Sequence, residues 1–342
     1  MQVTFVIPHD SGLRRGGVHM QVEMTRKALQ ENGIQVKILT PMTKQVGDIV
    51  HFFGTFNYYW HTALFCQVEG IPYVTSPIYL EPRSGWKLTA YRLWLKLKRR
   101  YPNQESKLLK SSRLLFTLSA SEEEKIRRLF GIRPERFRRV PNGVEERFAQ
   151  ANPKLFRERY GIREPFVLHV GFVEPRKNQL GLIRALKGLG IKMVFIGKAT
   201  NAKYLQRCQS EAGDQAVFLG EIPHESELLP SAYAAAKVFC LPSFSEVLSI
   251  AALEAATAGT RLVLSTPWQP QEHFGKFAFY VNPHSIAEIR QMVLKAWETP
   301  NDVDEQRRYF LKHYSWQKVA ELLIAGYQEV TSTSQNFKEV IN

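Results

Sequence analysis

Two adjacent cations stand between a strand pattern and a helix pattern. The apolar run 166–170 predicts a strand, Gly171 opens the loop after it, and Arg176 and Lys177 precede the helical pattern 180–189. A loop that leads into a helix presents unpaired backbone N–H groups at the positive end of the helix dipole. Fixed cations beside such groups suit a diphosphate. Two exposed loop cations are the alternative interpretation.

Two glutamates stand eight residues apart around the start of another helical pattern. Glu246 lies in the loop after the predicted strand 238–241, where a carboxylate can reach a hydroxyl-rich ligand, and Glu254 lies within the helical segment 250–257. On one helix, eight residues correspond to about two turns. The surrounding AALEAATAG is rich in small apolar side chains, so a carboxylate there is costly without a partner. A ribose diol is one such partner; an exposed helix position is the alternative.

Parallel sheets are predicted to position both groups of residues. Strand and helix patterns alternate over 3–119, with Ser121 expected as the N-cap of an acidic helix start, and the alternation restarts over 166–265. Such alternation predicts a parallel sheet covered by helices on both faces. Ligands of these sheets bind beyond the carboxyl ends of the strands. The sequence therefore predicts an α/β chain of two tandem doubly wound, Rossmann-like domains, 1–162 and 163–312, facing across a ligand-binding cleft.

Composition narrows the class of protein. The chain has 342 residues, of which 44% are hydrophobic, and this suits about two folded domains. No apolar run reaches the ~18–20 residues that span a bilayer, and the opening MQVTFVIPHD lacks the charged start of a signal peptide. The three cysteines are far apart and fit neither a disulfide framework nor a zinc motif. A reducing cytosol is therefore expected.

The net charge of +14 is concentrated in one half of the chain. Residues 1–162 carry 27 Lys and Arg against 14 Asp and Glu, a net +13, whereas the remaining residues carry 19 against 18. Such a half is expected to meet an anionic partner, namely nucleic acid, a membrane surface or a phosphorylated substrate, with general solubility as the alternative.

The segment 86–113 accounts for much of this charge, with nine cations and one acid. On a helix, one stripe would hold apolar residues, namely Trp86, Ala90, Leu93, Trp94 and Leu97. A basic amphipathic helix with tryptophan is typical of a membrane-surface contact. A core-packed helix with a solvated basic face is the alternative.

Several segments together resemble one enzyme family. GFVEPRKN followed by PSFSEVLSIAALEAATAG is similar to the signature of the family 4 glycosyltransferases. Further stretches also resemble the family: GGVHMQVEMTRKALQENGIQV, TLSASEEEKIRRLFGI, RRVPNGVE, HESELLPSAYAAAKVFCLPS and SWQKVAELLIAGYQEV. The resemblance covers most of the chain and implies the GT-B fold, with a closing helix at about 313–342 that packs back on the N-terminal domain. It also implies retaining, metal-independent transfer of a hexose from a nucleotide sugar to a glycan or lipid-linked glycan in cell-surface polysaccharide synthesis.

The resemblance assigns roles to individual residues. The predicted catalytic residues are Arg176 and Lys177, which would hold the donor diphosphate and stabilise its departure, and Glu246, which would contact the hydroxyls of the transferred sugar. Glu254 would bind the nucleotide ribose. Backbone groups would complete the phosphate cradle, read the base and let the N-terminal loop approach the donor. The donor-binding set is Gly16, Gly17, Asn142, Gly171, Ile222, Leu248, Ser249 and Glu254.

The chain also departs from the family pattern. Phe172 stands where many members have an arginine, and Arg176 is predicted to supply that charge instead. The family's cleft histidine is replaced in the stretch 76–78, which reads Ser-Pro-Ile. His9 and His51, both at strand ends, are the candidates for a polar group near the anomeric carbon, with a surface or packing role as the alternative.

No metal or other cofactor is expected. The chain has one Asp-x-Asp sequence, at 302–304, and its position beyond the second sheet favours an acidic helix start facing Arg307 and Arg308 over a metal site. A departing diphosphate needs its charge stabilised. Arg176 and Lys177, together with a helix dipole, can supply that stabilisation without a metal.

Two other functions stay open. One is an enzyme of the same architecture with another reaction, such as an epimerase or a phosphorylase, although the pyridoxal-binding lysine motif of phosphorylases is absent. The other is a basic protein that binds membrane or RNA and keeps a vestigial donor site; the two-glutamate motif does not fit that role, so no nucleic-acid partner is expected. The expected partners are a nucleotide sugar, a glycan or lipid-linked acceptor, and an anionic membrane surface through 86–113, in the cytoplasm or at the inner face of the cell membrane.

Overall fold

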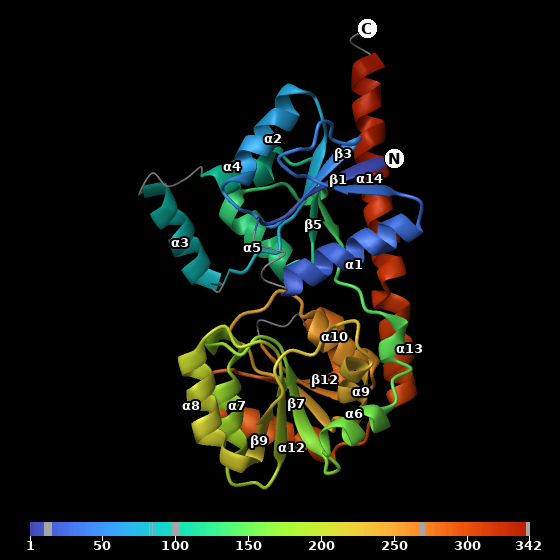
Figure 1. Ribbon diagram of the computed structural model, residues 1–342. Coiled ribbons are helices and arrows are strands. Elements are labelled where there is room, and N and C mark those ends of the chain that lie inside the picture. The colour runs from blue at the N-terminus through green and yellow to red at the C-terminus, as the bar shows by residue number, and fades with distance from the viewer. Residues whose placement is uncertain (10–15, 82, 84, 98–102, 267–270, 340–342) are drawn as a thin grey trace. The chain divides into compact units, whose positions relative to one another are not determined.

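The computed structural model describes residues 1–9, 16–81, 83, 85–97, 103–266 and 271–339 (Figure 1). The chain forms two compact units. The N-terminal unit comprises Met1–Gly143 and Trp316–Asn342, and the C-terminal unit comprises Val144–Ser315. Each contains a six-stranded parallel sheet, so the predicted α/β architecture with two Rossmann-like domains is confirmed.

The sheet of the N-terminal unit has the strand order β2-β1-β3-β4-β5-β6. Its strands are β1 (Gln2–Val6), β2 (Gln35–Ile38), β3 (Ile49–Phe53), β4 (Tyr73–Ser76), β5 (Leu115–Thr117) and β6 (Phe137–Arg139). Its helices are α1 (Gly17–Glu31), α2 (Tyr59–Val68), α3 (Gly85–Leu97), α4 (Gln104–Ser111), α5 (Ala120–Phe130) and α14 (Trp316–Glu339). Successive strand side chains point to opposite faces, so one face of β1 and β3 packs on α1 and α14 while the other packs on α2 and α4.

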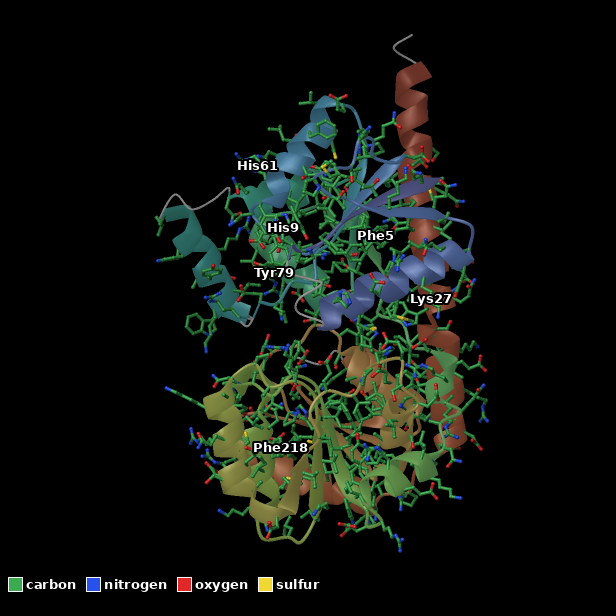
Figure 2. The ribbon with its side chains drawn as sticks, in the orientation of Figure 1. Phe5, His9, Lys27, His61, Tyr79 and Phe218 are labelled. Atoms are coloured by element: carbon green, nitrogen blue, oxygen red, sulfur yellow. The ribbon has the colours of Figure 1, made fainter. Side chains whose placement is uncertain are left out.

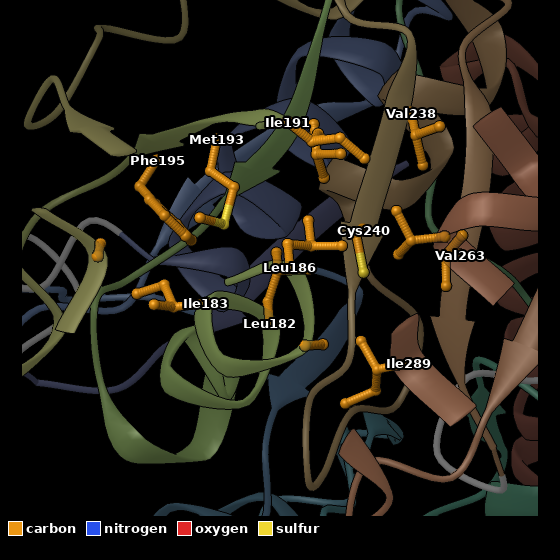
Figure 3. Close-up of a cluster of buried hydrophobic side chains, with 14 of the residues drawn as sticks. Leu182, Ile183, Leu186, Ile191, Met193, Phe195, Val238, Cys240, Val263 and Ile289 are labelled. Atoms are coloured by element: carbon orange, nitrogen blue, oxygen red, sulfur yellow. The ribbon is translucent and has the colours of Figure 1, made fainter. Parts of the chain in front are cut away.

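The sheet of the C-terminal unit has the order β12-β11-β10-β7-β8-β9. Its strands are β7 (Phe166–Val170), β8 (Lys192–Ile196), β9 (Ala216–Phe218), β10 (Val238–Leu241), β11 (Arg261–Ser265) and β12 (Ala278–Val281). Its helices are α6 (Pro153–Tyr160), α7 (Gln179–Leu186), α8 (Ala202–Ala212), α9 (Leu228–Ala235), α10 (Ile250–Thr257), α11 (Gln271–Phe274), α12 (Ile286–Glu298) and α13 (Val303–Tyr314). Side chains of α7, α8 and α12 cover one face of this sheet, with Leu182, Met193 and Val263 in the shared core (Figure 3).

Both sheets contain a point where the strand order reverses. In the N-terminal unit β1 lies between β2 and β3, and in the C-terminal unit β7 lies between β10 and β8. Ligands of open α/β sheets bind beyond the carboxyl ends of the strands at such a switch point. The loops after β1 and β3, and those after β7 and β10, are therefore the places where binding residues are expected.

The unit boundaries differ from the predicted domain boundary at 162/163. The chain passes between units at 143/144, and α6 belongs to the C-terminal unit. The backbone N–H of Phe156 in α6 donates to Ser231 Oγ (2.8 Å), and its ring lies 5.7 Å from the ring of Phe166 in β7. The second passage falls at 315/316, because Val144 pairs with Ser315 in a parallel bridge. These contacts place α6 with the sheet of the C-terminal unit, and composition alone carries no information about them.

The start of α5 also differs from its predicted position. Ser119, and not Ser121, is the N-cap, and its hydroxyl accepts a hydrogen bond from the backbone N–H of Glu122 (3.1 Å). The carboxylate of Glu122 accepts from the backbone N–H groups of Tyr79 and Leu118 at 2.7 and 2.6 Å. The helix therefore begins two residues earlier, directly after β5, and its buried acid fastens the loop that follows β4.

His51 is a core residue of the N-terminal unit and not the cleft group that its position at a strand end suggested. It is fully buried in β3, with Nδ1 2.7 Å from Tyr327 Oη on α14 and Nε2 2.8 Å from Ser76 Oγ. Burial lowers the pKa of His51 to about 3. The closing helix is thus fastened to the N-terminal unit through a neutral imidazole.

This histidine predicts that the N-terminal unit is sensitive to acid. Above pH 6.5 the His51 imidazole is neutral in both the folded and the unfolded protein. Below pH 6.5 the unfolded protein binds a proton at this residue, whereas the folded protein does not do so until about pH 3. Stability should fall by about 1.4 kcal/mol per pH unit in that window. We expect His51→Phe to be less stable at pH 7, because Ser76 and Tyr327 lose their partner, but to lose stability less steeply. Urea unfolding between pH 7 and 5 checks this, and an unchanged slope contradicts it; exposed His61→Gln is the control.

Candidate functional site

The residues predicted to bind a diphosphate lie at the switch point of the C-terminal unit. β7 and β10 are hydrogen-bonded neighbours, so the loops after them meet at one edge of the sheet. Asn178 ties these loops together: its side-chain amide donates to the carbonyls of Pro242 (3.0 Å) and Pro283 (2.8 Å). Its Oδ1 accepts from the backbone N–H of Gly181 (3.2 Å) and caps α7. Asn178 has φ +58°, a left-handed conformation that asparagine tolerates well.

Arg176, Lys177 and Glu246 form one ion cluster. Lys177 Nζ donates to Glu246 Oε1 at 2.6 Å, and Arg176 Nη1 donates to the same oxygen at 3.1 Å and to the carbonyl of Ser245 at 2.9 Å. Glu174 holds the other side of the guanidinium, with Oε1 3.0 Å from Nε and 2.7 Å from Nη2. The structure therefore brings together the three residues that were predicted to be catalytic. It also places Glu174, which was not predicted, in the same cluster.

The cluster is largely shielded from solvent, and its charges stabilise one another. Burial alone raises the pKa of Glu246, but the charges of Lys177 and Arg176 outweigh it and hold that pKa below its usual value. Burial and the nearby charge of Lys177 lower the pKa of His169 to about 4, so this β7 imidazole is neutral beneath the loop. The side chains of Lys177 and Glu246 are each 10% exposed. Two positive charges are thus held in fixed positions by two carboxylates.

Gly171 allows this cluster to sit close to the strand end. It has φ +148°, in the region that favours glycine, and a Cβ there would lie 3.3 Å from Lys177 Cε. A side chain at the neighbouring Gly197 would collide with the carbonyl oxygen of Gly171. The two glycines therefore let the loops after β7 and β8 pack backbone to backbone under the lysine.

Glu254 is buried in α10, but its partners are protein side chains. Its Oε1 lies 2.8 Å from His224 Nε2, and its Oε2 accepts from Tyr233 Oη at 2.7 Å. The structure therefore supplies the partners for which the sequence suggested a ribose diol, so burial by itself does not imply a ligand. A carboxylate has about four lone-pair sites, so each oxygen can still accept a further hydrogen bond.

A second layer orients this carboxylate. Arg147 donates to the carbonyl oxygen of His224, lies 3.4 Å from its Nδ1, and pairs with Glu145 at 3.1 Å. Burial alone lowers the pKa of His224, but the hydrogen bond and charge of Glu254 raise it above its usual value. The network Glu145–Arg147–His224–Glu254 thus fixes one orientation of the Glu254 carboxylate.

The remaining donor-binding candidates of the C-terminal unit lie around α10 and after β9. Ser249 is the N-cap of α10, its hydroxyl accepting from the backbone N–H of Ala252 (3.3 Å), and Leu248 precedes it; both are nearly buried. They stand at the positive end of the helix dipole. Ile222 is 7% exposed and lies in the same loop as His224. Their backbone roles stay predictions.

The candidates of the N-terminal unit are placed as follows. Gly16 is the N-cap of α1, and Gly17 is its first residue, with open space where a Cβ would stand. Asn142 is buried at the end of the unit, next to Gly143, whose backbone packs against the Trp316 ring of α14. A donor-binding role for these three residues stays a prediction. His9 is exposed and stacks on Tyr58, with ring centroids 4.3 Å apart.

The Asp-x-Asp sequence starts a helix, as expected. Asp302 is the N-cap of α13, and its Oδ1 accepts from the backbone N–H of Glu305 (2.8 Å). Arg307 does not face the acids, because it donates to the carbonyl of Ala258 (3.0 Å). Within the described part of the chain, no group of three or more potential ligand side chains could hold a metal ion.

Sequence reasoning missed the residues that support the site. His224 and Tyr233 come from a loop and from α9, and only the fold brings them to Glu254. Asn178 follows Arg176 and Lys177 in the sequence, but its hydrogen bonds to the carbonyls of Pro242 and Pro283 depend on the loops after β10 and β12. The one sequence signal for this support was His224, a polar residue in the loop that follows the predicted strand 216–219.

Comparisons with known proteins match both units. Residues 43–148 match the model described as Glycosyltransferase Family 4, and residues 154–313 match Glycosyl transferases group 1. The chain is 25% identical over 65% of its length to the serotype-specific mannosyltransferase WbdA of Escherichia coli. It is 26% identical over 71% of its length to the MMP alpha-(1->4)-mannosyltransferase of Mycolicibacterium hassiacum. These matches span 29% and 60% of the two relatives.

Solved structures share the fold. Sucrose-phosphate synthase from Thermosynechococcus elongatus superimposes with a TM-score of 0.76 and 17% identity, covering 97% of this chain and all of that one. Anabaena HepE, determined in complex with UDP and glucose, gives 0.72 and 16%, covering 96% of this chain and all of that one. The two consecutive family models, together with the two Rossmann-like units, show that this chain belongs to the family 4, or group 1, glycosyltransferases.

Proposed function

We propose that this glycosyltransferase transfers a hexose from a nucleotide sugar to a glycan acceptor, with retention of configuration and without a metal ion. The observation that carries the proposal is the cluster of Arg176, Lys177 and Glu246 at the switch point between β7 and β10. It combines fixed cations for a diphosphate with a carboxylate for sugar hydroxyls. Retention is inferred from the family resemblance, since residue spacing carries no stereochemistry.

The two cations supply what a departing nucleoside diphosphate needs. Lys177 has three N–H donors, one of which is directed at Glu246, so others remain to meet phosphate oxygens. A largely solvent-excluded ammonium interacts more strongly with anionic oxygen than it does in bulk water. As the bond between the anomeric carbon and the diphosphate breaks, the new bond to the acceptor oxygen forms on the same face, and the acceptor proton passes to the departing phosphate.

Glu254 is proposed to hold the nucleotide ribose. Its carboxylate is fixed by His224 and Tyr233, so it meets the ribose hydroxyls without a loss of side-chain freedom. The start of α10 beside it adds a positive dipole end. The relatives named mannosyltransferases make mannose a sugar to test first, and the WbdA name and that of an O-antigen chain mannosyltransferase point to surface polysaccharide as the product class.

A nucleotide-binding screen tests this function. UDP, GDP and ADP and their sugar conjugates are added in the presence of EDTA, and melting of the full chain is followed. We expect at least one nucleoside diphosphate to raise the melting temperature, and Lys177→Ala to remove most of that rise. If no nucleotide or nucleotide sugar changes melting, the proposal fails.

A membrane surface is the second proposed partner, through α3. The apolar stripe predicted from the sequence is exposed, with Trp86, Leu93 and Leu97 exposed by 76%, 58% and 75%. Leu88, on the opposite side of the helix, packs into the core. α3 contains no acidic residue, and this suits anionic lipid. No helix among the described residues is long and apolar enough to cross a membrane.

Vesicle binding checks this partner. Lys98, Arg99 and Arg100 of the basic segment 86–113 lie outside the described residues. The exposed stripe offers a test that does not need them: Leu93→Ser with Leu97→Ser should weaken binding to vesicles containing phosphatidylglycerol several-fold. Nucleotide-induced melting shifts should not change. Equal vesicle binding by parent and variant, or none by the parent, contradicts the membrane proposal.

A further inference from the structure

The residues with which the chain enters the C-terminal unit pack against the side chains that hold the proposed ribose carboxylate. Residues 144–148 follow the first passage between the units, and we call them the entry segment. Phe148 in this segment is fully buried, and its ring lies 5.7 Å from the Tyr233 ring and 5.8 Å from the His224 ring. The Arg147 guanidinium lies over the Phe148 ring, 4.7 Å from its centroid. The entry segment therefore brings a cation to the partners of that carboxylate.

The imidazole of His224 is held at both of its nitrogens. It lies in the loop that follows β9, the strand whose last residue, Phe218, is labelled in Figure 2. Its Nε2 is 2.8 Å from Glu254 Oε1, and its Nδ1 is 3.4 Å from Arg147 Nη2. An ionised carboxylate only accepts hydrogen bonds, and a guanidinium only donates them. These two partners therefore select the neutral imidazole with its proton on Nε2, so that Nδ1 accepts from Arg147.

Arg147 is held beside this imidazole by contacts of its own. Its Nε donates to Glu145 Oε2 at 3.1 Å, its Nη1 is 3.7 Å from Glu227 Oε1, and its Nη2 also donates to the carbonyl oxygen of His224. The side chain is 21% exposed. An arginine with two carboxylates and a carbonyl around it keeps its position when no ligand is bound, and such pre-organisation reduces the entropy lost on binding.

A second proton on His224 would reverse the contact at Nδ1. The nitrogen would then donate, so it would face a donor of like charge on Arg147 and turn to the carboxylate of Glu145, whose Oε2 is 3.7 Å away. Burial lowers the pKa of His224, and the hydrogen bond and charge of Glu254 raise it. The charge of Arg147 lowers that pKa, the charge of Glu145 raises it, and the net effect is a rise. An imidazolium would also offset part of the negative charge on Glu254, and a hydroxyl binds a fully charged carboxylate more strongly.

We propose that Arg147 and His224 are positioning residues for the nucleotide, because Arg147 favours the neutral form of His224 and protonation of His224 weakens nucleotide binding. The inference rests on the proposed function, in which Glu254 meets the ribose, and adds a proton-dependent control of that contact. The alternative is a purely structural clasp, in which the entry segment is fastened to its unit and the charge on the imidazole has no effect on the nucleotide.

Variants that move the imidazole pKa in opposite directions test the arrangement of charges. The ring signals of His224, assigned with His224→Gln, are followed by NMR titration of the full chain. We expect Arg147→Gln to raise the pKa of His224, because a facing cation is lost, and Glu145→Gln to lower it, because a facing carboxylate is lost. Arg157→Gln, which removes a half-buried guanidinium elsewhere in the same unit, is the matched control and should leave that pKa unchanged. Shifts of the two variants in the same direction, or no shift in either, contradict the inference.

The pH dependence of nucleotide binding connects this titration to function. Nucleoside diphosphate affinity is measured by titration calorimetry at about pH 8 and about pH 6, with EDTA present. His224→Gln keeps an N–H that can donate to Glu254 but does not titrate, so it records the change that comes from the nucleotide phosphates alone. We expect affinity to fall several-fold more in the parent than in His224→Gln over this range.

The contact from Arg147 should be visible in binding and not in turnover. Arg147→Gln should weaken nucleoside diphosphate binding about 3–10-fold, the worth of about one hydrogen bond, and raise the KM for the donor while kcat stays close to that of the parent. His224→Ala should weaken binding further, and His224→Gln should recover most of that loss at the higher pH, because its amide still donates to Glu254. A structural clasp would instead lower stability and leave KM unchanged.

The outcomes separate this inference from the function on which it rests. A parent protein that binds no nucleoside diphosphate overturns the proposed function. Normal binding whose pH dependence is equal in the parent and in His224→Gln, or an Arg147→Gln variant with the affinity of the parent, overturns the inference alone. If Arg147→Gln fails to fold, Glu145→Gln replaces it, and the fall in affinity must then move to lower pH together with the pKa of His224.

Discussion

Replacing Lys177 with alanine is expected to lower kcat by about 10²–10³-fold, the usual loss when one pre-organised charge facing a departing group is removed. Lys177 Nζ lies 2.6 Å from Glu246 Oε1, and its side chain is 10% exposed, so water does not replace it well. The rate of nucleoside diphosphate release at saturating donor measures this loss. Arg176→Ala should also lower kcat, but by a smaller factor, because the Arg176 side chain is more exposed.

Two comparisons keep this prediction specific. Lys187→Ala removes an exposed lysine just after α7 and should leave the rate unchanged. Lys177→Arg keeps the charge but places a larger planar group against Gly171, so it should recover part of the rate at most. If the kcat of Lys177→Ala lies within a few-fold of the parent value, Lys177 does not take part in the reaction.

Replacing Glu254 with alanine should weaken nucleoside diphosphate binding by about 10–100-fold, the worth of a hydrogen bond to a charged group. The same change leaves Tyr233 Oη and His224 Nε2 without their acceptor. Tyr233 is fully buried, and an unpaired buried group costs about 1–3 kcal/mol of stability; the partly buried His224 should add less. Affinity is measured by titration calorimetry and stability by urea unfolding.

Tyr233→Phe separates the two effects of Glu254. It removes the hydroxyl that donates to Glu254 Oε2 but leaves the carboxylate in place, so stability should fall while nucleotide affinity changes little. If Glu254→Ala loses stability as expected and binds nucleotide as tightly as the parent, Glu254 is a purely structural acid. This distinction matters because the structure shows that the carboxylate has partners of its own.

The strands that carry the site were predictable because they are buried on both faces. Parallel strands covered by helices appear as short, continuous apolar runs, and the predicted strands 166–170 and 238–241 match β7 and β10 residue for residue. The cations and Glu246 follow these runs directly, so their meeting at one edge of the sheet follows from topology. A correct prediction of these neighbouring strands was therefore enough to predict that Arg176, Lys177 and Glu246 lie together.

Contacts between distant segments were not predictable from the same patterns. The N-cap of α5 is Ser119 and not the predicted Ser121, because the Glu122 carboxylate accepts hydrogen bonds from the backbone N–H groups of Tyr79 and Leu118. The histidine at 51 became a core residue because α14, from the far end of the chain, brings Tyr327 to it. Local periodicity describes which face is apolar; it contains no information on which distant side chain completes a hydrogen bond.

The central claim is that the C-terminal unit holds a nucleotide sugar by its diphosphate, on Arg176 and Lys177. The most direct measurement is release of nucleoside diphosphate from GDP-mannose and UDP-glucose, in the presence of EDTA, with a mannose- or glucose-containing oligosaccharide as acceptor. The account predicts release from at least one donor by the parent, with a loss of two orders of magnitude or more in Lys177→Ala. Release that is equal in parent and variant, or that stops on addition of EDTA, would contradict it.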